Sequence, residues 1–331
     1  MVIKLSFKKC LALLCLIGSL VWLAAFSFPD NRLHLVFCDV GQGDATLITQ
    51  GFNQILIDGG PNDKVLTCLK NNLPFFDRTI EVVALTHPEA DHLTGLLSVL
   101  EKYKVDWFVA GPEGNSSATF AELVKKLESF CKATPCRHGQ GRLVNVYTGE
   151  EIKAGDIVLQ TLWPEKEWIA ENIRGETTED GKQVSDCTEK ESVSDLSFCS
   201  QSSVLSHLSS ETGAILGAKT IDTHLNDYSL VFLLKYKRKK FLLMGDADSR
   251  VQDKFIENIT DLPIDILKFP HHGSKTGMSK VFLEHIKPKE AVISVGKNSF
   301  GHPTAEALEM LKNAGVKIRR TDLEGEIHYE Y

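Results

Sequence analysis

The chain has 331 residues, of which 43% are apolar and 24% charged, and its formal net charge at pH 7 is −7. This composition excludes a disordered protein, and the length suffices for one large domain or two small ones. The negative charge argues against a strongly basic nucleic-acid-binding protein. It is concentrated between Glu165 and Thr220, where eleven acidic residues face five basic ones. We therefore predict an acidic, low-complexity insertion over about residues 165–222.

The first thirty residues differ from the rest of the chain. Lys4, Lys8 and Lys9 precede an uncharged run, Cys10–Phe28, of a length that can just cross a bilayer. Basic residues on the N-terminal side keep that end in the cytoplasm. We expect residues 1–30 to be a single membrane anchor, with the following domain outside the cytoplasm. A signal peptide cleaved near Ala25–Ser27 is the alternative, and it predicts secretion.

Eight cysteines suit an exported protein. Two pairs lie in loop-like sequence and can form disulfides, Cys131 with Cys136 and Cys187 with Cys199, although free thiols explain them equally well. Cys38 falls in a predicted strand and Cys68 in a predicted helix. No CxxC pair occurs, so the sequence does not predict a zinc site built from cysteines.

From Leu33 onward, short apolar runs are followed by amphipathic segments. The predicted strands are Leu33–Cys38, Ala45–Thr49, Gln54–Ile57, Val82–Leu85, Trp107–Ala110, Ile157–Leu162, Ser229–Tyr236, Lys240–Met244, Ile264–Lys268, Ala291–Val295 and Lys317–Arg320. The predicted helices are His92–Tyr103, Thr119–Phe130, Ser249–Asn258, Ser279–His285 and Thr304–Asn313. This order predicts sheets covered by helices.

Polar residues with metal-binding side chains follow one of these buried strands. In "VVALTHPEADHLTGLL", five apolar or small residues lead to His87, Glu89, Asp91 and His92. Burying two carboxylates is costly unless a cation offsets it. His87 and Glu89 project to one side of an extended segment, and the other two begin a helix. One loop can thus serve two adjacent cations.

The second half of the chain supplies further ligands at strand ends. "LLMGDAD" places Asp246 where a carboxylate can bridge two cations, and "LKFPHHGS" offers His271 and His272. The donors are nitrogen and oxygen atoms only. Two ions about 3.5–4 Å apart activate water and hold a phosphoester. Each half thus pairs a strand that ends in Asp with a strand that ends in His, which suggests two similar halves facing one cleft.

These motifs, with "FCDVGQGDATLI", "ILIDGG", "NDYSLVFLL" and "SVGKNSFGHPTAEALEML", resemble the metallo-β-lactamase-like domain of the competence protein ComEC. The resemblance runs from about Leu33 to the C-terminus. It implies an α/β fold over residues 31–331, a four-layer αββα metallo-β-lactamase sandwich with a dinuclear centre between its sheets. It also implies a ligand set of His87 and Glu89 for the first metal, Asp91 and His92 for the second, Asp246 as the bridge and His271 to complete the shell.

The ligand set departs from the resemblance at one position. The broader fold has His where Glu89 stands, and the ComEC group usually has Asp. A carboxylate in place of an imidazole makes Mn²⁺ a rival to Zn²⁺. Of the two adjacent histidines, we prefer His271 as the ligand because neighbouring side chains diverge, and assign His272 to the substrate or to supporting a ligand.

Several residues near these motifs have two interpretations. Asp44 can touch the centre or close an Asx turn, and Asp58 is expected to support a ligand or a turn. Asn226 stands where the fold often has another histidine and can contact substrate. His302, before a helix start, is a leaving-group acid or phosphate contact, or a loop histidine. Further substrate-contact candidates are Ser274, Lys275, Lys268 and Lys297.

The segment "KYKRKK", Lys235–Lys240, is predicted to form a basic hairpin turn, which is more often solvated than bound to phosphate.

The sequence therefore predicts a membrane-anchored, outward-facing hydrolase with two divalent ions, Zn²⁺ or Mn²⁺, that cleaves phosphodiesters, with DNA as the substrate that the resemblance implies. Asp246 and Asp91 take part through the metals, and His302 assists the leaving group. One alternative is a hydrolase of small esters, lactones or thioesters, because fold alone does not choose the substrate. The other is a non-catalytic, metal-stabilised module that binds DNA or a protein at the cell envelope.

Overall fold

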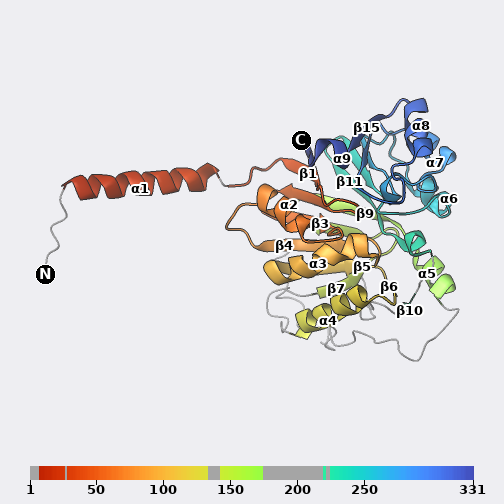
Figure 1. Ribbon diagram of the computed structural model, residues 1–331, viewed down its shortest axis with the longest axis horizontal. Helices are drawn as coiled ribbons and strands as arrows, with labels where there is room; N and C mark the ends of the chain where they lie inside the picture. The colour runs from red at the N-terminus through yellow and green to blue at the C-terminus, as the bar shows by residue number, and fades with distance from the viewer. Residues whose placement is uncertain (1–6, 27, 133–141, 174–218, 221–223) are drawn as a thin grey trace.

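The computed structural model describes residues 7–26, 28–132, 142–173, 219–220 and 224–331 (Figure 1). Helix α1 (Phe7–Phe26) projects from the folded domain. It covers most of the segment that the sequence predicts as a membrane anchor. Among the described residues, however, no helix combines the length and the apolar character that crossing a membrane requires. The transmembrane prediction is therefore not confirmed.

Two seven-stranded sheets form the centre of the domain. The first sheet has the order β16-β1-β2-β3-β4-β5-β7. Its strands are β1 (Leu33–Phe37), β2 (Thr46–Gln50), β3 (Asn53–Ile57), β4 (Thr79–Leu85), β5 (Lys104–Ala110), β7 (Arg142–Asn145) and β16 (Ile327–Glu330). Strands β3, β4, β5 and β7 run parallel, whereas β1, β2 and β16 pair antiparallel.

The second sheet has the order β15-β14-β13-β12-β11-β9-β8. Its strands are β8 (Glu151–Ala154), β9 (Ile157–Trp163), β11 (Val231–Tyr236), β12 (Lys239–Leu243), β13 (Ile266–Lys268), β14 (Glu290–Ile293) and β15 (Lys317–Arg320). Strands β12 to β15 run parallel. Alternate residues of each sheet point inward, and one buried apolar cluster that includes Phe37, Phe232 and Phe241 joins the two sheets.

Helices cover the outer face of each sheet. On the first sheet lie α2 (Lys64–Asn72), α3 (Ala90–Lys102) and α4 (Ala118–Lys132), and on the second lie α6 (Gln252–Phe255), α7 (Lys280–Ile286) and α8 (Ala305–Asn313). A separate apolar cluster lies under each helical layer. The described domain is therefore a four-layer αββα sandwich, which confirms the predicted fold.

Short elements fill the connections between these layers. They are β6 (Glu113–Gly114), α5 (Lys166–Ile173), β10 (Lys219–Thr220), η3 (Leu225–Tyr228), η4 (Ile256–Asn258), η5 (His271–Gly273) and α9 (Thr321–Glu324). Helix α5 lies at the start of the predicted acidic insertion and packs Ile169 against Leu225 and Tyr228. The structure therefore describes the start of the predicted insertion as a helix. Residues 174–218 and 221–223 lie outside the described residues. The side chains of the two predicted loop disulfides also lie outside them.

The parallel strands determine where the polar motifs meet. Asp58 follows β3, His87 follows β4, Asp246 follows β12 and His272 follows β13. Neighbouring parallel strands bring their carboxyl ends to one edge of a sheet. The two facing sheets therefore present these four residues at the same end of the sandwich.

Candidate metal centre

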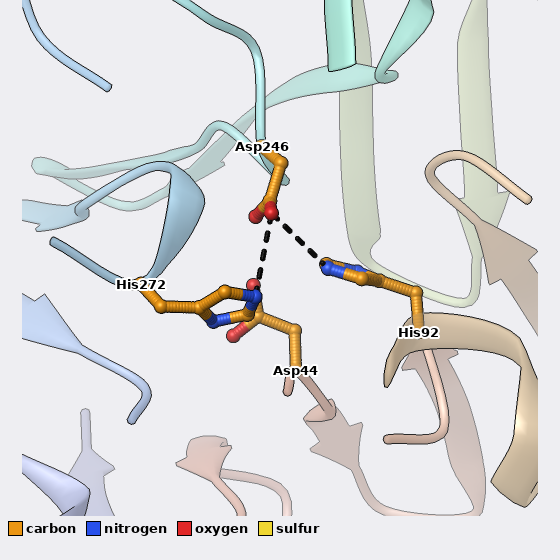
Figure 2. Close-up of side chains that lie close together, drawn as sticks. All are labelled: Asp44, His92, Asp246 and His272. Carbon is orange, nitrogen blue, oxygen red and sulfur yellow. Dashed lines mark ion pairs between the residues drawn. The ribbon is translucent and has the colours of Figure 1, made fainter. Parts of the chain in front are cut away.

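Four buried side chains converge between the two sheets: Asp44, His92, Asp246 and His272 (Figure 2). One ligand atom from each lies within 4.8 Å of the others. Asp246 is central, because its Oδ2 atom lies 3.4 Å from His92 Nε2 and 3.3 Å from His272 Nε2. Asp44, in the loop before β2, and His92, in α3, come from the half of the sandwich built on the first sheet, and the other two residues come from loops of the second sheet. We call this set the metal cluster.

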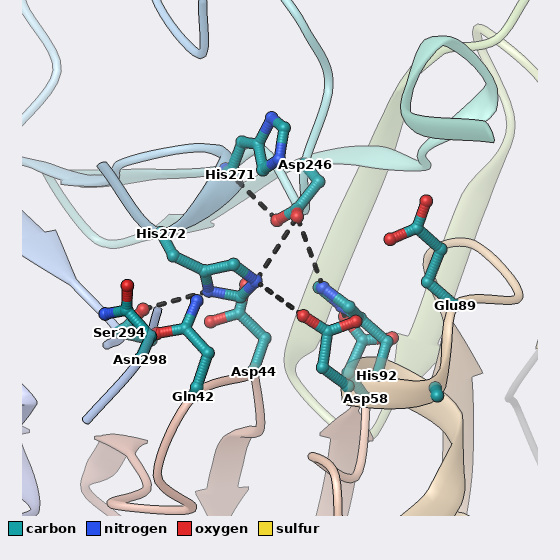
Figure 3. A network of polar contacts seen from close by, with 12 residues as sticks. Gln42, Asp44, Asp58, Glu89, His92, Asp246, His271, His272, Ser294 and Asn298 are labelled. Atoms are coloured by element: carbon teal, nitrogen blue, oxygen red, sulfur yellow. Dashed lines mark hydrogen bonds and ion pairs between the residues drawn. The ribbon is translucent and has the colours of Figure 1, made fainter. Parts of the chain in front are cut away.

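The two histidine rings of the metal cluster are oriented by hydrogen bonds to their Nδ1 atoms. His92 Nδ1 lies 2.9 Å from Asp58 Oδ2, and His272 Nδ1 lies 3.0 Å from the carbonyl oxygen of Ser294 (Figure 3). Carboxylate and carbonyl oxygens only accept hydrogen bonds, so each Nδ1 donates, and in the neutral ring each Nε2 keeps the lone pair that a metal needs. Both Nε2 atoms are buried without a hydrogen-bond partner. That arrangement is typical of histidines that bind a metal.

His87 lies beside the metal cluster, with its ring centroid 4.2 Å from that of His92. Its Nδ1 atom contacts Thr86 Oγ1 at 3.1 Å and Ser229 Oγ at 3.2 Å, and its Nε2 atom has no hydrogen-bond partner. Glu89, predicted as its co-ligand, is farther out: its side chain is 40% exposed and its Oε2 lies 3.9 Å from His87 Nε2. The structure brings His87 into the site. It leaves Glu89 at the edge of the site, as Figure 3 shows.

Asp91 reaches the metal cluster from the start of α3. Its Oδ2 atom lies 3.2 Å from His272 Nε2, and its carbonyl oxygen accepts a hydrogen bond from the Asp44 amide at 3.2 Å. The helix start and the loop before β2 are thereby held together. Gly43 permits this approach, because a Cβ atom there would lie 2.3 Å from the Asp91 carbonyl oxygen.

The preference for His271 over His272 as the ligand is not supported by the geometry. The His272 side chain is 2% exposed and faces the metal cluster, whereas the His271 side chain is 27% exposed. The His271 ring contacts the Asn226 side-chain amide at 3.1 Å, and its backbone N–H donates to Asp246 Oδ1 at 3.1 Å. Both histidines have φ of 51° in η5, and this tight turn sends adjacent side chains in different directions. The sequence does not reveal which one points inward.

The acidic side chains determine the charge of the site. Burial alone lowers the pKa of His92, but the carboxylates of Asp246 and Asp58 outweigh it and raise that pKa well above its usual value. Burial also lowers the pKa of His272, but the carboxylates of Asp246 and Asp44 outweigh burial and raise that pKa to about 10. Burial alone raises the pKa of Asp246, and the two histidines depress it well below its ordinary range. The site therefore favours positive charge at its centre, which protons or a cation can supply.

Asp44 also forms a buried ion pair with Lys268, and both side chains are almost fully inaccessible. Lys268 Nζ donates to the Phe269 carbonyl oxygen at 3.0 Å as well. Lys268 is thus engaged inside the protein and is not free to contact substrate. The pairing joins the first sheet to the second directly beneath the metal cluster. Sequence reasoning placed both residues near the site but did not predict that they pair.

The remaining predicted residues lie around this centre. The His302 ring centroid is 5.5 Å from that of His271, and the Asn298 side chain holds the His302 loop by accepting from its backbone N–H at 3.1 Å. Burial, together with His271 and His272, lowers the pKa of His302, so a neutral ring is favoured and the predicted role as an acid is not supported. Ser274 is buried and contacts Thr276.

The other predicted basic residues lie in two places. Lys275 and Lys297 are exposed, which leaves them free for substrate. The Lys235–Lys240 hairpin lies at the opposite end of β11 and β12 from Asp246. Lys235 and Lys240 pair with Asp261 there. This hairpin is therefore a charged turn remote from the site and not a phosphate-binding surface.

The donor set fits a divalent cation. Three buried imidazole nitrogens have no hydrogen-bond partner. Carboxylates from Asp246, Asp91 and Asp44 lie among or beside these nitrogens. Nitrogen and oxygen donors of this kind bind Zn²⁺ and Mn²⁺. His92, His272 and Asp246 are the residues best placed to hold an ion, and His87 lies beside them.

Comparisons with known proteins agree with this geometry. No family model matches the chain. In sequence, 107 residues (32% of the chain) are 33% identical to ComE operon protein 3 of Bacillus subtilis, and 90 residues (27% of the chain) are 34% identical to competence protein ComA of Neisseria gonorrhoeae. These matches span 14% and 13% of the relatives' own lengths. In structure, the metallo-β-lactamase fold protein YhfI of Bacillus subtilis matches with a TM-score of 0.50 and 12% identity, over 90% of this chain and 100% of that one.

Proposed function

We propose that this chain, which has the metallo-β-lactamase fold and a segment similar to competence proteins, is a metal-dependent hydrolase of phosphodiesters that acts on DNA. One observation carries the proposal: the Nε2 atoms of His92 and His272 are buried, unpartnered and within 3.4 Å of the same Asp246 oxygen. A divalent cation bound by these three side chains would supply the positive charge that the buried carboxylates favour. DNA as the substrate class is supported only by the names of the competence proteins to which a third of the chain is similar.

Each residue of the site has a distinct role in this proposal. His92, His272 and Asp246 would hold one divalent ion, with Asp91 or Asp44 beside it, and His87 would contribute to holding a second. Such ions, when bound, polarise a phosphoryl oxygen and lower the pKa of coordinated water. Asp58 and Ser294 keep the two histidine rings in the orientation that ligation needs. The neutral His302 ring can donate one hydrogen bond to a phosphate oxygen or accept a proton.

The test uses the full chain with Mn²⁺ or Zn²⁺ and a panel of single-stranded DNA, duplex DNA, a generic phosphodiester and a lactone. Wild-type protein is expected to cleave DNA, and His92→Ala and Asp246→Ala to lose at least 100-fold in rate, since both remove a group that acts on the transition state. His328→Ala, at an exposed position on β16, is the matched control and should retain full activity.

Each other outcome of the panel has a definite meaning. Cleavage of the lactone alone would assign the site to small esters. Retention of metal with no turnover, together with salt-dependent DNA binding, would make the chain a binding module. Full DNA cleavage by metal-free protein, or by His92→Ala, would overturn the proposal.

We also propose that the domain lies outside the cytoplasm. The disulfide between Cys38 and Cys68 supports this location, because disulfides persist mainly in oxidising compartments. The lysines that precede the apolar N-terminal segment support the same orientation. In intact cells that express the full chain, protease added from outside is expected to digest the domain. Digestion that requires cell lysis would contradict this location.

A further inference from the structure

Four exposed phenylalanines form a contiguous patch on the domain. Phe28, Phe52, Phe75 and Phe76 are 60%, 47%, 72% and 44% exposed. The Phe28 ring lies 6.0 Å from that of Phe52 and 5.8 Å from that of Phe76, and the rings of Phe75 and Phe76 are 5.3 Å apart. We call these residues the aromatic patch. Burying one such side chain away from water contributes roughly 1.5–3 kcal/mol. Covering all four therefore favours binding of an apolar partner.

The aromatic patch is built from chain turns and not from a groove. Phe52 occupies the turn between β2 and β3, where Gly51 has φ of 59°. Phe75 and Phe76 lie in the loop between α2 and β4, and Phe28 lies between α1 and β1. Figure 1 shows α1 and the α2–β4 loop on the same side of the molecule. Protruding apolar turns fit insertion into a lipid bilayer better than docking against a rigid protein surface.

Helix α1 indicates which partner covers this patch. Its described side chains are all exposed, including Leu11, Leu13, Leu14, Leu16 and Ile17. At 100° per residue these positions are distributed around the whole helix, so a protein groove, which covers one stripe, leaves most of them in water. Phe28 follows the end of α1 by two residues in the chain, so this apolar helix is next in sequence to the aromatic patch.

We propose that the aromatic patch inserts into the interfacial layer of a lipid bilayer and thereby docks and orients the domain. Aromatic side chains are favoured at that depth. The patch lies at the amino ends of β3 and β4, whereas Asp58 and His87 follow their carboxyl ends. Strand β4 has seven residues, which at ~3.3 Å each separates the two ends by about 23 Å. The bound domain therefore holds the metal cluster away from the membrane surface, open to substrate from the aqueous phase. This inference does not depend on the proposed hydrolase activity.

The first experiment adds one tryptophan to the full chain and measures fluorescence with phosphatidylcholine–phosphatidylglycerol vesicles that carry brominated acyl chains. Phe75→Trp is expected to gain a blue-shifted component that the brominated lipids quench. Val281→Trp, at a position on α7 that is equally exposed at 72%, is the matched control and should gain none. Equal quenching in both variants, no added quenching in Phe75→Trp, or no vesicle binding by the wild type would each overturn the proposal.

The second experiment measures vesicle partitioning by sedimentation. The triple variant Phe52→Glu, Phe75→Glu and Phe76→Glu is expected to partition roughly tenfold less than the wild type, and α1, which the variant keeps, supplies the remaining affinity. A control triple variant, Val281→Glu, Phe300→Glu and Leu323→Glu, alters apolar residues elsewhere that are at least as exposed as most of the patch, and it should partition as the wild type does. Unchanged partitioning of the patch variant, with loss of self-association instead, would overturn the lipid assignment in favour of a second copy of the chain.

Discussion

At the scale of single residues, the ion pair between Asp44 and Lys268 makes a sharp prediction about stability. Asp44→Asn leaves the Lys268 ammonium buried without its partner, and such a change costs about 3–5 kcal/mol. The double variant Asp44→Asn/Lys268→Met removes both charges and should recover at least half of that loss. Urea unfolding in the presence of a chelator measures the free energy of unfolding without any contribution from bound metal.

The exposed pair of Lys280 and Glu284 provides the control for this prediction, because its side chains are 80% and 64% exposed. Lys280→Met should change the free energy of unfolding by less than about 0.5 kcal/mol. If the free energy of unfolding of Asp44→Asn lies within about 1 kcal/mol of the wild-type value, the ion pair does not stabilise the contact between the two sheets.

Glu113 predicts how stability changes with pH. It is fully buried in β6 with Oε2 unpartnered, and burial raises its pKa from 4.5 to about 8. Between these two values the unfolded chain releases the proton while the folded protein keeps it, so the free energy of unfolding falls as pH rises from about 4.5 to 8. At about 1.36 kcal/mol per pKa unit, the loss is at most ~5 kcal/mol.

Glu113→Gln keeps the shape of this side chain and removes its titration. The variant should match the wild type near pH 4.5 and exceed its free energy of unfolding by roughly 2–5 kcal/mol above pH 8. Glu122→Gln, on the exposed face of α4, serves as the control and should follow the wild type at every pH. Parallel unfolding curves for Glu113→Gln and the wild type across this range would refute the assignment.

The residues of the site differ in how far sequence reasoning could reach them. His92, Asp246 and Asp91 follow strands or begin a helix in recognisable motifs, so their convergence is predictable from topology. The choice between His271 and His272 depends on the turn in η5, which leaves no sequence signal. The pairing of Asp44 with Lys268 joins residues far apart in the chain, and only the packing of the two sheets reveals it.

At the scale of elements, the disulfide between Cys38 and Cys68 ties the end of β1 to α2 across 30 residues. The loop that carries Asp44 begins directly after Cys38. Replacing both cysteines with alanine should lower the free energy of unfolding by about 2–4 kcal/mol, because the unfolded chain regains the freedom of the closed loop. Cys15→Ala, at an exposed free thiol, should have no effect.

Reducing agent separates the disulfide from a change in packing. Thiol treatment should bring the unfolding midpoint of the wild type close to that of the double variant and leave the variant itself unchanged. A wild-type midpoint that is unaffected by reduction would show that the bond does not stabilise the protein.

The sequence predicted long apolar strands better than short amphipathic ones. Strand β4 follows from a run of apolar residues, and α8 from its Thr304 cap, whose hydroxyl oxygen accepts from the Ala307 amide. Strand β8 has no such signal, since its four residues include Glu151 and Lys153 and it is stabilised by pairing with β9. The disulfide between Cys38 and Cys68 was missed because both cysteines lie in or beside regular elements, where loop-based reasoning does not search.

At the scale of the whole molecule, the metal cluster and the Asp44–Lys268 ion pair join two sheets that meet mainly through apolar contacts. A cation that binds only the folded protein raises its stability, by about 2.7 kcal/mol at a concentration 100 times its dissociation constant. Mn²⁺ or Zn²⁺ should therefore raise the thermal unfolding midpoint by several degrees, and a chelator should reverse the shift. Asp246→Ala should lose the metal-dependent shift, whereas His328→Ala should keep it. An identical shift in Asp246→Ala would place the bound metal elsewhere.

The central claim is that residues from both halves of the sandwich hold a divalent ion, and anomalous X-ray diffraction from crystals of the full chain grown with Mn²⁺ or Zn²⁺ tests it most directly. We predict an anomalous peak about 2.0–2.3 Å from His92 Nε2, His272 Nε2 and an Asp246 carboxylate oxygen. No peak among these three residues, or peaks only at surface side chains, would contradict the account.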